Sequence, residues 1–84
     1  MKNILFTIAL LVSFSSFGQT AEEYFNSGNQ KDEAKDYNGA INDYTKAIEL
    51  NPDAAVAYSN RGSSKSNLKD YNGAISDYTK AIEL

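Results

Sequence analysis

The sequence predicts an all-α fold, a solenoid of helix-turn-helix repeats with two units, of which the second is incomplete. The main observation is a block of fifteen residues, Asp36 to Leu50, that returns at Asp70 to Leu84 and changes only where Asn42 becomes Ser76. Units of about 20 to 50 residues that recur in this way bury their apolar faces by stacking on one another. A second observation is that the apolar residues of each block recur at helical spacing. A third is that a more polar helical segment precedes each block, so the repeating unit of 34 residues is a pair of helices.

The first 18 residues have the pattern of a secretory signal peptide. Lys2 supplies the positive start, residues 4–12 form an apolar run, and Ser16 and Gly18 are the small residues that precede cleavage before Gln19. A helix that crosses a membrane needs about 20 apolar residues, whereas this run is shorter and ends in serines. We therefore expect cleavage, with an uncleaved anchor as the alternative.

Composition limits the partners of the remaining chain. Residues 19–84 carry seven basic and eleven acidic side chains, a net charge of about −4. Duplex nucleic acid and anionic membrane surfaces both require a concentrated positive patch, so neither is an expected partner. The chain has no cysteine, so export brings no disulfide to this small domain.

The residue types needed for most catalytic and metal sites are missing. There is no histidine and no cysteine, which removes the usual nucleophile–base pairs and the metal sites built on these ligands. The carboxylates of residues 32–36 alternate with lysines and are assigned to a solvated helix end. A calcium loop around Asp36 fails, because its first and last ligand positions are occupied by Ala34 and Thr45. We therefore expect no enzyme, no cofactor and no metal.

The first helix of each unit is predicted over residues 21–34 and 54–68. Thr20 and Glu23 have the spacing of a capping box, in which each side chain bonds the backbone amide of the other residue. This helix start lies within two residues of the predicted cleavage site, so the two interpretations support each other. Before the second of these helices, Pro52 ends the copied block because proline cannot continue a helix, and Asp53 is predicted to cap the next helix.

The second helix of each unit is predicted to start after Asp36 and Asp70, whose carboxylates can accept hydrogen bonds from first-turn amides. One face of each helix carries an apolar stripe, formed by Tyr37, Ala40, Ile41, Tyr44, Ala47 and Ile48 in the first copy and by Tyr71, Ala74, Ile75, Tyr78, Ala81 and Ile82 in the second. The opposite face, with Asp43, Lys46 and Glu49, is expected to be solvated. We assign the tyrosines to packing rather than to a platform for stacking a ligand.

This pattern resembles the tetratricopeptide repeat family, whose unit is a helix-turn-helix of 34 residues. The matching positions are an early aromatic residue, a small residue where the helices meet, a small-aromatic-small series and a closing proline: Tyr24 and Tyr58; Gly28 and Gly62; Ala40, Tyr44 and Ala47 with Ala74, Tyr78 and Ala81; and Pro52. One departure is Lys31 and Lys65, which replace a bulky apolar residue of the family. There we expect loose packing, with lysine methylenes lying on apolar surface.

The resemblance divides the chain into a signal peptide, residues 1–18, and a repeat domain, residues 19–84. Repeat 1 spans about 21–54 and repeat 2 about 55–84, the latter truncated inside its last helix at Leu84. Because solenoids generally need about three repeats and a polar cap, we expect either a fragment of a longer array or a protein that assembles with a partner or with itself.

The resemblance implies a non-catalytic module that binds a peptide or partner domain in the groove lined by the first helix of each unit. The matching groove positions are Glu22, Phe25, Asn29, Asp32, Val56, Ser59, Asn60, Ser63 and Ser66. Ordinary helix surface is the alternative for these residues. The signal peptide predicts export to the periplasm or the exterior of a bacterial cell. Two other functions remain open: the interaction part of a larger exported sensor, receptor or enzyme, and a self-assembling structural repeat.

Overall fold

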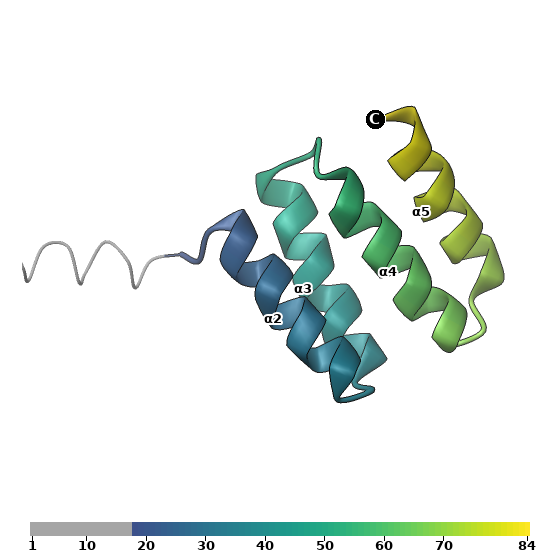
Figure 1. Ribbon diagram of the computed structural model, residues 1–84, viewed down its shortest axis with the longest axis horizontal. Helices are drawn as coiled ribbons and strands as arrows, with labels where there is room; N and C mark the ends of the chain where they lie inside the picture. Colours follow the sequence, from purple (N-terminus) through teal and green to yellow (C-terminus); the bar gives the residue numbers. More distant parts are fainter. Residues whose placement is uncertain (1–17) are drawn as a thin grey trace, which may run out of the picture.

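The computed structural model describes residues 18–84, which form four helices in two antiparallel pairs. The helices are α2 (Ala21–Glu33), α3 (Tyr37–Leu50), α4 (Ala55–Asn67) and α5 (Tyr71–Glu83). They lie side by side in chain order, so that α3 stands between α2 and α4, while α5 is at the edge of the array and packs on α4 (Figure 1). These residues contain no strand, and the predicted all-α repeat architecture is confirmed. The predicted signal peptide, apart from Gly18, lies outside the described residues.

Three of the four helices start at the side-chain caps that the sequence predicts. Thr20 Oγ1 accepts the amide hydrogen of Glu23 at 3.1 Å, and Glu23 Oε1 accepts that of Thr20 at 2.9 Å, which completes a capping box. In the two copied blocks, Asp36 and Asp70 each accept the amide hydrogen three positions later, at 3.1 and 3.0 Å. That residue is a glycine in both blocks, and the capping carboxylate occupies the space that a Cβ there would enter.

The first helix of each pair ends in a turn with a positive φ at a lysine, Lys35 (64°) and Lys69 (67°). After α2, the amide of Asp36 donates to the carbonyl of Lys31 at 2.8 Å, and the amide of Lys35 donates to that of Asp32 at 2.9 Å. The same two bonds close α4. This is the Schellman arrangement, which usually places glycine at the left-handed position. The turn between the two helices of each pair therefore places a lysine in a backbone conformation that is unfavourable for any residue with a side chain.

Tyr44 lies at the centre of the core and is fully buried. Its ring is 5.8 Å from that of Phe25, and a Cβ added at Gly28 would lie 2.6 Å from a ring carbon. The missing side chain at Gly28 is therefore what allows α2 to approach α3. The other buried apolar residues are small or β-branched and come mainly from the predicted stripe: Ala40, Ala47, Ile48, Ala57 and Ala74.

Asp43, predicted from the sequence to lie in solvent, is buried on the side of α3 that faces α2. Ser27 donates to its carboxylate at 2.6 Å, and the Lys31 ammonium lies 2.9 Å from the same oxygen. Burial by itself raises the pKa of the Asp43 carboxyl, but the hydrogen bond from Ser27 and the charge of Lys31 outweigh it and lower that pKa below its usual value. The prediction was wrong because helical periodicity shows only that Asp43 lies off the apolar stripe. It does not show that the neighbouring helix places a lysine beside this carboxylate.

Asp77 repeats this buried ion pair in the second unit. Arg61 donates to both carboxylate oxygens at 2.8 Å, and the Lys65 ammonium is 3.0 Å from one of them. Arg61 also donates to Thr45 Oγ1 at 3.1 Å, and its guanidinium lies 5.4 Å from the ring centre of Tyr58. Lysine at the family's bulky apolar position therefore forms an interhelical ion pair in both repeats, beyond the apolar contact that the sequence predicted.

Two further sequence predictions fail in the described residues. The N-cap of α4 is Ala54, without a side-chain cap hydrogen bond, instead of Asp53. The turn is instead organised by Asn51, whose side-chain oxygen accepts the Asp53 amide hydrogen at 3.3 Å. Tyr71 and Tyr78, assigned to packing, are exposed, because no described helix lies against the outer side of α5.

Candidate partner-binding site

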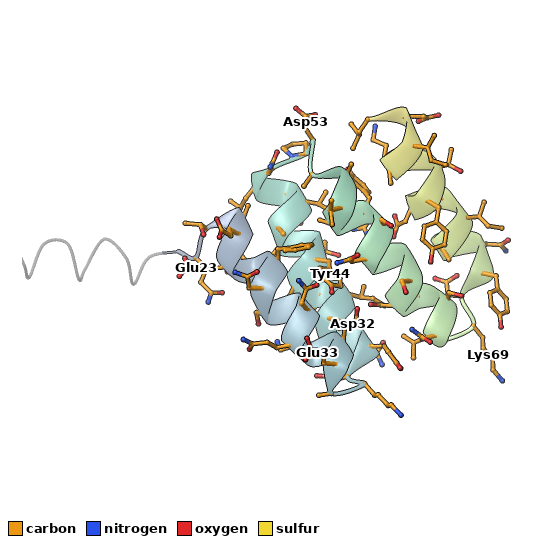
Figure 2. The ribbon with its side chains drawn as sticks, viewed as in Figure 1. Glu23, Asp32, Glu33, Tyr44, Asp53 and Lys69 are labelled. Carbon is orange, nitrogen blue, oxygen red and sulfur yellow. The ribbon has the colours of Figure 1, made fainter. Side chains whose placement is uncertain are left out.

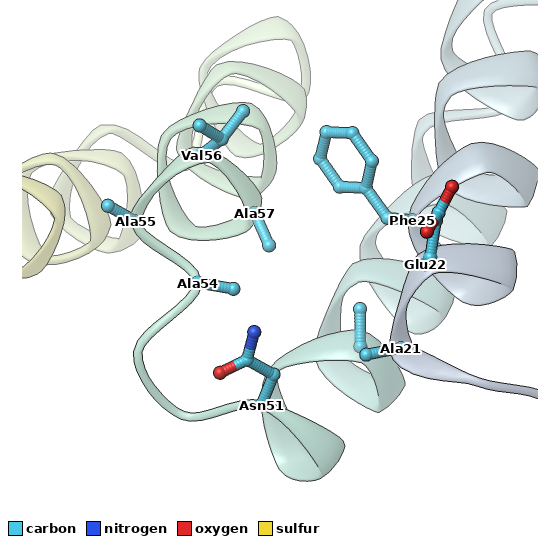
Figure 3. A pocket seen from close by; sticks show the side chains of 9 residues that line it. Ala21, Glu22, Phe25, Asn51, Ala54, Ala55, Val56 and Ala57 are labelled. Atoms are coloured by element: carbon cyan, nitrogen blue, oxygen red, sulfur yellow. The ribbon is translucent and has the colours of Figure 1, made fainter.

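A predominantly apolar pocket of about 310 Å³ opens between the first turns of α2 and α4 (Figure 3). The last turn of α3 contributes to its wall. Figure 3 shows Phe25 and Glu22 on one side and Val56 and Ala57 facing them on the other. The lining residues are Ala21, Glu22, Phe25, Ala47, Asn51, Ala54, Ala55, Val56 and Ala57. A hollow of this composition accepts an apolar side chain, because burying that side chain against alanines, a phenyl ring and a valine removes both surfaces from water.

The local sequence explains why the pocket forms here. Five of the lining residues are alanines, whose short side chains leave space beside Asn51, and the exposed Val56 forms one apolar rim of the pocket. Phe25 is held in place by its contact with the Tyr44 ring. The charged lining residue is Glu22, so the mouth of the pocket carries a carboxylate and no cationic side chain.

A polar cluster continues from Tyr44 along the same side of α2 and α4. The Tyr44 hydroxyl is within hydrogen-bonding distance of Asn29 Oδ1 (2.6 Å) and Asp32 Oδ2 (3.0 Å), and Figure 2 shows Tyr44 and Asp32 close together. Asn60 donates to Asn29 at 3.1 Å, and Ser64 donates to Asp32 at 2.7 Å. These last two bonds join the first helix of one repeat to the first helix of the next.

Burial and the neighbouring carboxylate determine the protonation state of Tyr44. Desolvation raises the pKa of its hydroxyl, and the hydrogen bond and charge of Asp32 raise it further. The hydroxyl is therefore a hydrogen-bond donor throughout the physiological pH range. It cannot act as a phenolate nucleophile or general base in this setting.

The nine predicted groove residues separate into three groups. Three of them, Glu22, Phe25 and Val56, meet in the pocket. Three others, Asn29, Asp32 and Asn60, lie in the polar cluster, where they already bond to one another or to neighbours. The remaining three, Ser59, Ser63 and Ser66, lie on α4 and belong to neither feature.

Two residues of the cluster were not among the predicted groove positions. Tyr44 was assigned to packing, which is confirmed, but its hydroxyl is also the centre of the cluster. Ser64 is fully buried and bonds Asp32. A serine in a polar helix gives no sequence signal for such a bond, whereas a buried tyrosine predicts in general that its hydroxyl needs a partner.

The described residues place both apolar and polar groups on the surface formed by α2 and α4. Within residues 18–84, no group of three or more His, Cys, Asp or Glu side chains is placed to hold a metal ion. None of the helices in the same range has the length and apolar character needed to cross a bilayer. What the surface offers is an apolar pocket, amide and hydroxyl groups, and carboxylates.

Comparisons with known proteins identify the family of the repeats. Residues 22–66 match a family model described as TPR repeat, and residues 55–84 match one described as Tetratricopeptide repeat. The first match covers more than half of the chain. A search of curated proteins found no match.

Proposed function

Because the chain belongs to the tetratricopeptide repeat family, we propose that it is a non-catalytic protein-interaction module whose α2–α4 surface binds a segment of another protein. Repeats of this family generally mediate protein–protein interaction. The observation that carries the proposal is the open apolar pocket, in which Glu22, Phe25 and Val56 meet. An apolar side chain of the partner anchors there, as the central residues of protein interfaces commonly do.

The pocket is a better anchor than the polar cluster. Asn29 and Asp32 are already hydrogen-bonded within the molecule, so a ligand must replace existing bonds to use them. Val56, by contrast, is 61% exposed, and covering it gains free energy without breaking a bond. The cluster serves to hold α2 and α4 at a fixed separation beside the pocket.

Charge favours neutral or basic partner segments. Glu22 is at the pocket mouth, the lining residues include no cation, and the chain after the predicted cleavage site has a net charge of about −4. A lysine or arginine next to the anchoring apolar residue would face the Glu22 carboxylate. This contribution weakens as salt shortens the range of electrostatic attraction.

Selection of random displayed peptides against the protein tests this function. We expect the selected peptides to share a bulky apolar residue beside a basic one, and Val56→Asp to weaken their binding at least tenfold in fluorescence anisotropy. The matched control is Asn42→Asp, an exposed substitution on α3 with the same change of charge, which should leave the affinity unchanged. Equal affinity of wild type and Val56→Asp for every selected peptide would remove the pocket as the binding site.

We also propose that the module is exported and that the mature chain starts at Gln19. The capping box supports this, because helix α2 begins at Ala21, immediately after the predicted cleavage site. Mass spectrometry of the protein recovered from the periplasm or medium of an expressing bacterium tests the proposal. Retention of residues 1–18 in the recovered protein would contradict it.

A further inference from the structure

Helices α3 and α5 both carry an asparagine followed by a glycine in their first turn, Asn38–Gly39 and Asn72–Gly73. No other asparagine of the chain precedes a glycine. The residues around the two pairs are the same, Asp-Tyr-Asn-Gly-Ala-Ile, at 36–41 and 70–75. Both asparagine side chains are exposed to water. Since the local sequences are identical, each pair serves as a reference for the reactivity of the other.

An asparagine side chain reacts with the backbone amide nitrogen of the next residue when the two can meet. The deprotonated nitrogen attacks the side-chain carbon Cγ, so that a new C–N bond forms, the Cγ–Nδ2 bond breaks and ammonia leaves. Water then opens the cyclic imide at either of its carbonyls, which gives aspartate or isoaspartate. The net change is the gain of one water and the loss of one ammonia. Glycine in the second position favours the reaction, because it has no Cβ to hinder the attack and its backbone rotates freely.

The capping aspartates oppose this reaction at both pairs. Asp36 Oδ1 accepts the amide hydrogen of Gly39 at 3.1 Å, and Asp70 Oδ1 accepts that of Gly73 at 3.0 Å. A carboxylate is too weak a base to remove an amide proton, and its negative charge disfavours the deprotonated nitrogen that must attack. The helix opposes the reaction as well, because a ψ of about −42° turns the glycine nitrogen away from the asparagine side chain. The reaction therefore requires the helix start to open.

The two products act on the helix start in opposite ways. Neither α3 nor α5 has an acidic residue in its first turn. Asn38 and Asn72 are the second residues of their helices, so aspartate formed there places a carboxylate where the helix dipole favours negative charge. In isoaspartate the main chain runs through the side-chain carbon and gains a methylene, which moves the glycine amide relative to its cap. Isoaspartate therefore prevents the capping bond from re-forming in its original register.

We propose that Asn38 and Asn72 are sites of spontaneous deamidation, and that Asp36 and Asp70 hold each site unreactive while its helix start is closed. Water is the only co-reactant. The rate follows local opening of the helix start, which is smaller and more frequent than unfolding of the whole chain. Because the ammonia is lost, the asparagine is not regenerated, and damaged helix starts accumulate as the protein ages. This inference does not depend on the proposed binding function.

The test follows both sites in one sample of the folded protein, incubated in mildly alkaline buffer and digested with trypsin. Cleavage after lysine releases the sites in separate peptides, residues 36–46 and 70–80, which differ in mass. Mass spectrometry with fragmentation measures the conversion of each asparagine. We expect Asp70→Ala to speed the reaction at Asn72 about fivefold, the change in open population that corresponds to about 1 kcal/mol for a lost cap. The reaction at Asn38 in the same sample should keep its wild-type rate.

Control variants separate the cap from general stability. Gly28→Ala disturbs the packing against Tyr44 without touching either cap, and should change neither rate by more than a small factor. Asp53→Ala removes an exposed loop aspartate that caps no helix and should have no effect. Asp70→Ser keeps a side-chain acceptor at the cap and should restore most of the protection. In strong urea, where no helix remains, wild type and Asp70→Ala should react at the same rate.

Three outcomes overturn the inference. The first is no conversion at either asparagine, or a rate at Asn72 that Asp70→Ala leaves unchanged or lowers, since the carboxylate would then not protect the amide. The second is equal acceleration of both sites by Asp70→Ala, or an equal effect of Gly28→Ala, which would make unfolding of the whole chain the controlling step. The third is the same acceleration by Asp70→Ala in strong urea, which would assign the effect to the neighbouring sequence instead of the cap.

Discussion

Arg61 holds Asp77 with two parallel hydrogen bonds, each 2.8 Å long, across the interface of α4 and α5. At the equivalent place in the first repeat, Ser27 and Lys31 satisfy Asp43 without an arginine. In both repeats, the preceding helix thus neutralises a buried carboxylate. One of its two partners is a lysine in both cases, and the other is a serine in the first repeat and an arginine in the second. A two-point arginine clamp fixes orientation as well as charge.

Acid should unfold the protein through these carboxylates. The pKa values of Asp43 and Asp77 are lowered in the folded state, because hydrogen bonds and cations outweigh the opposing effect of burial. Their stabilising contribution is therefore complete above the unfolded pKa of about 3.9 and is lost as pH falls through the lower folded values. As far as these two carboxylates contribute, the urea midpoint should stay constant from pH 7 to about pH 4 and then decline toward pH 2.5. Asp43→Asn should flatten the decline, whereas the exposed loop variant Asp53→Asn should retain it.

Gly28→Ala and Gly62→Ala should differ although they are the same change at equivalent positions. A Cβ at Gly28 would lie 2.6 Å from the fully buried Tyr44 ring, which has no room to move. A Cβ at Gly62 would be 3.1 Å from the half-exposed Tyr78 ring and 3.2 Å from both the Ala74 carbonyl oxygen and Asp77 Cβ, tight contacts but longer than the one at Gly28. We expect Gly28→Ala to lower the free energy of unfolding by about 1–2 kcal/mol, and Gly62→Ala to change it by less than about 1 kcal/mol, since alanine is the better helix former. Urea titration followed by circular dichroism measures both, and a larger loss at Gly62 would contradict this account.

Lys69→Gly should stabilise the fold. Lys69 has a φ of 67°, and its side chain extends from the α4–α5 turn into solvent (Figure 2). Glycine relieves the left-handed strain of about 1–2 kcal/mol but loses more entropy on folding, so the expected net gain is up to about 1 kcal/mol. The control is Lys46→Gly in the middle of α3, which should cost about 1 kcal/mol because the backbone there is helical. A destabilised Lys69→Gly variant would mean that the side chain has a contact that outweighs the strain.

The hydroxyl of Tyr44 should contribute to stability, whereas that of Tyr78 should not. Tyr44→Phe removes the donor that Asn29 and Asp32 share, at an expected cost of about 1 kcal/mol. Tyr78→Phe removes a hydroxyl from a half-exposed ring and should leave the urea midpoint within error. Equal effects of the two substitutions would show that the hydrogen bonds of the polar cluster add no net stability.

The helices could be predicted closely because their signals are local. Thr20, Asp36 and Asp70 predict helix starts because each caps an amide only three residues away. The apolar stripe identifies the face of α3 that is buried. The prediction for Asp53 was wrong because a second polar side chain, that of Asn51, lies on the other side of Pro52 and accepts the Asp53 amide hydrogen. The helix then starts one residue later, with Ala54 as its N-cap. Local chemistry thus gives the elements more reliably than their exact ends.

Contacts between helices were less predictable. Asp43 looked like a solvated residue because its burial depends on Lys31, twelve positions away on another helix. One signal was available: lysine and aspartate recur together in the second unit as Lys65 and Asp77 with the same separation. The exposure of Tyr78 could not be predicted, since its own block is almost identical to one in which the equivalent tyrosine is buried.

The position of Arg61 determines how the two repeats unfold. One nitrogen of its guanidinium is bonded to Thr45 in the first repeat, and two others are bonded to Asp77 in the second. Opening either repeat alone would break one set of these bonds and leave the other holding a partly desolvated cation. In a nearest-neighbour description of repeat proteins, such a residue stabilises the interface between the two units, so that neither unit unfolds independently of the other. The two repeats should therefore unfold as a single cooperative transition, with the same midpoint in circular dichroism and in tyrosine fluorescence.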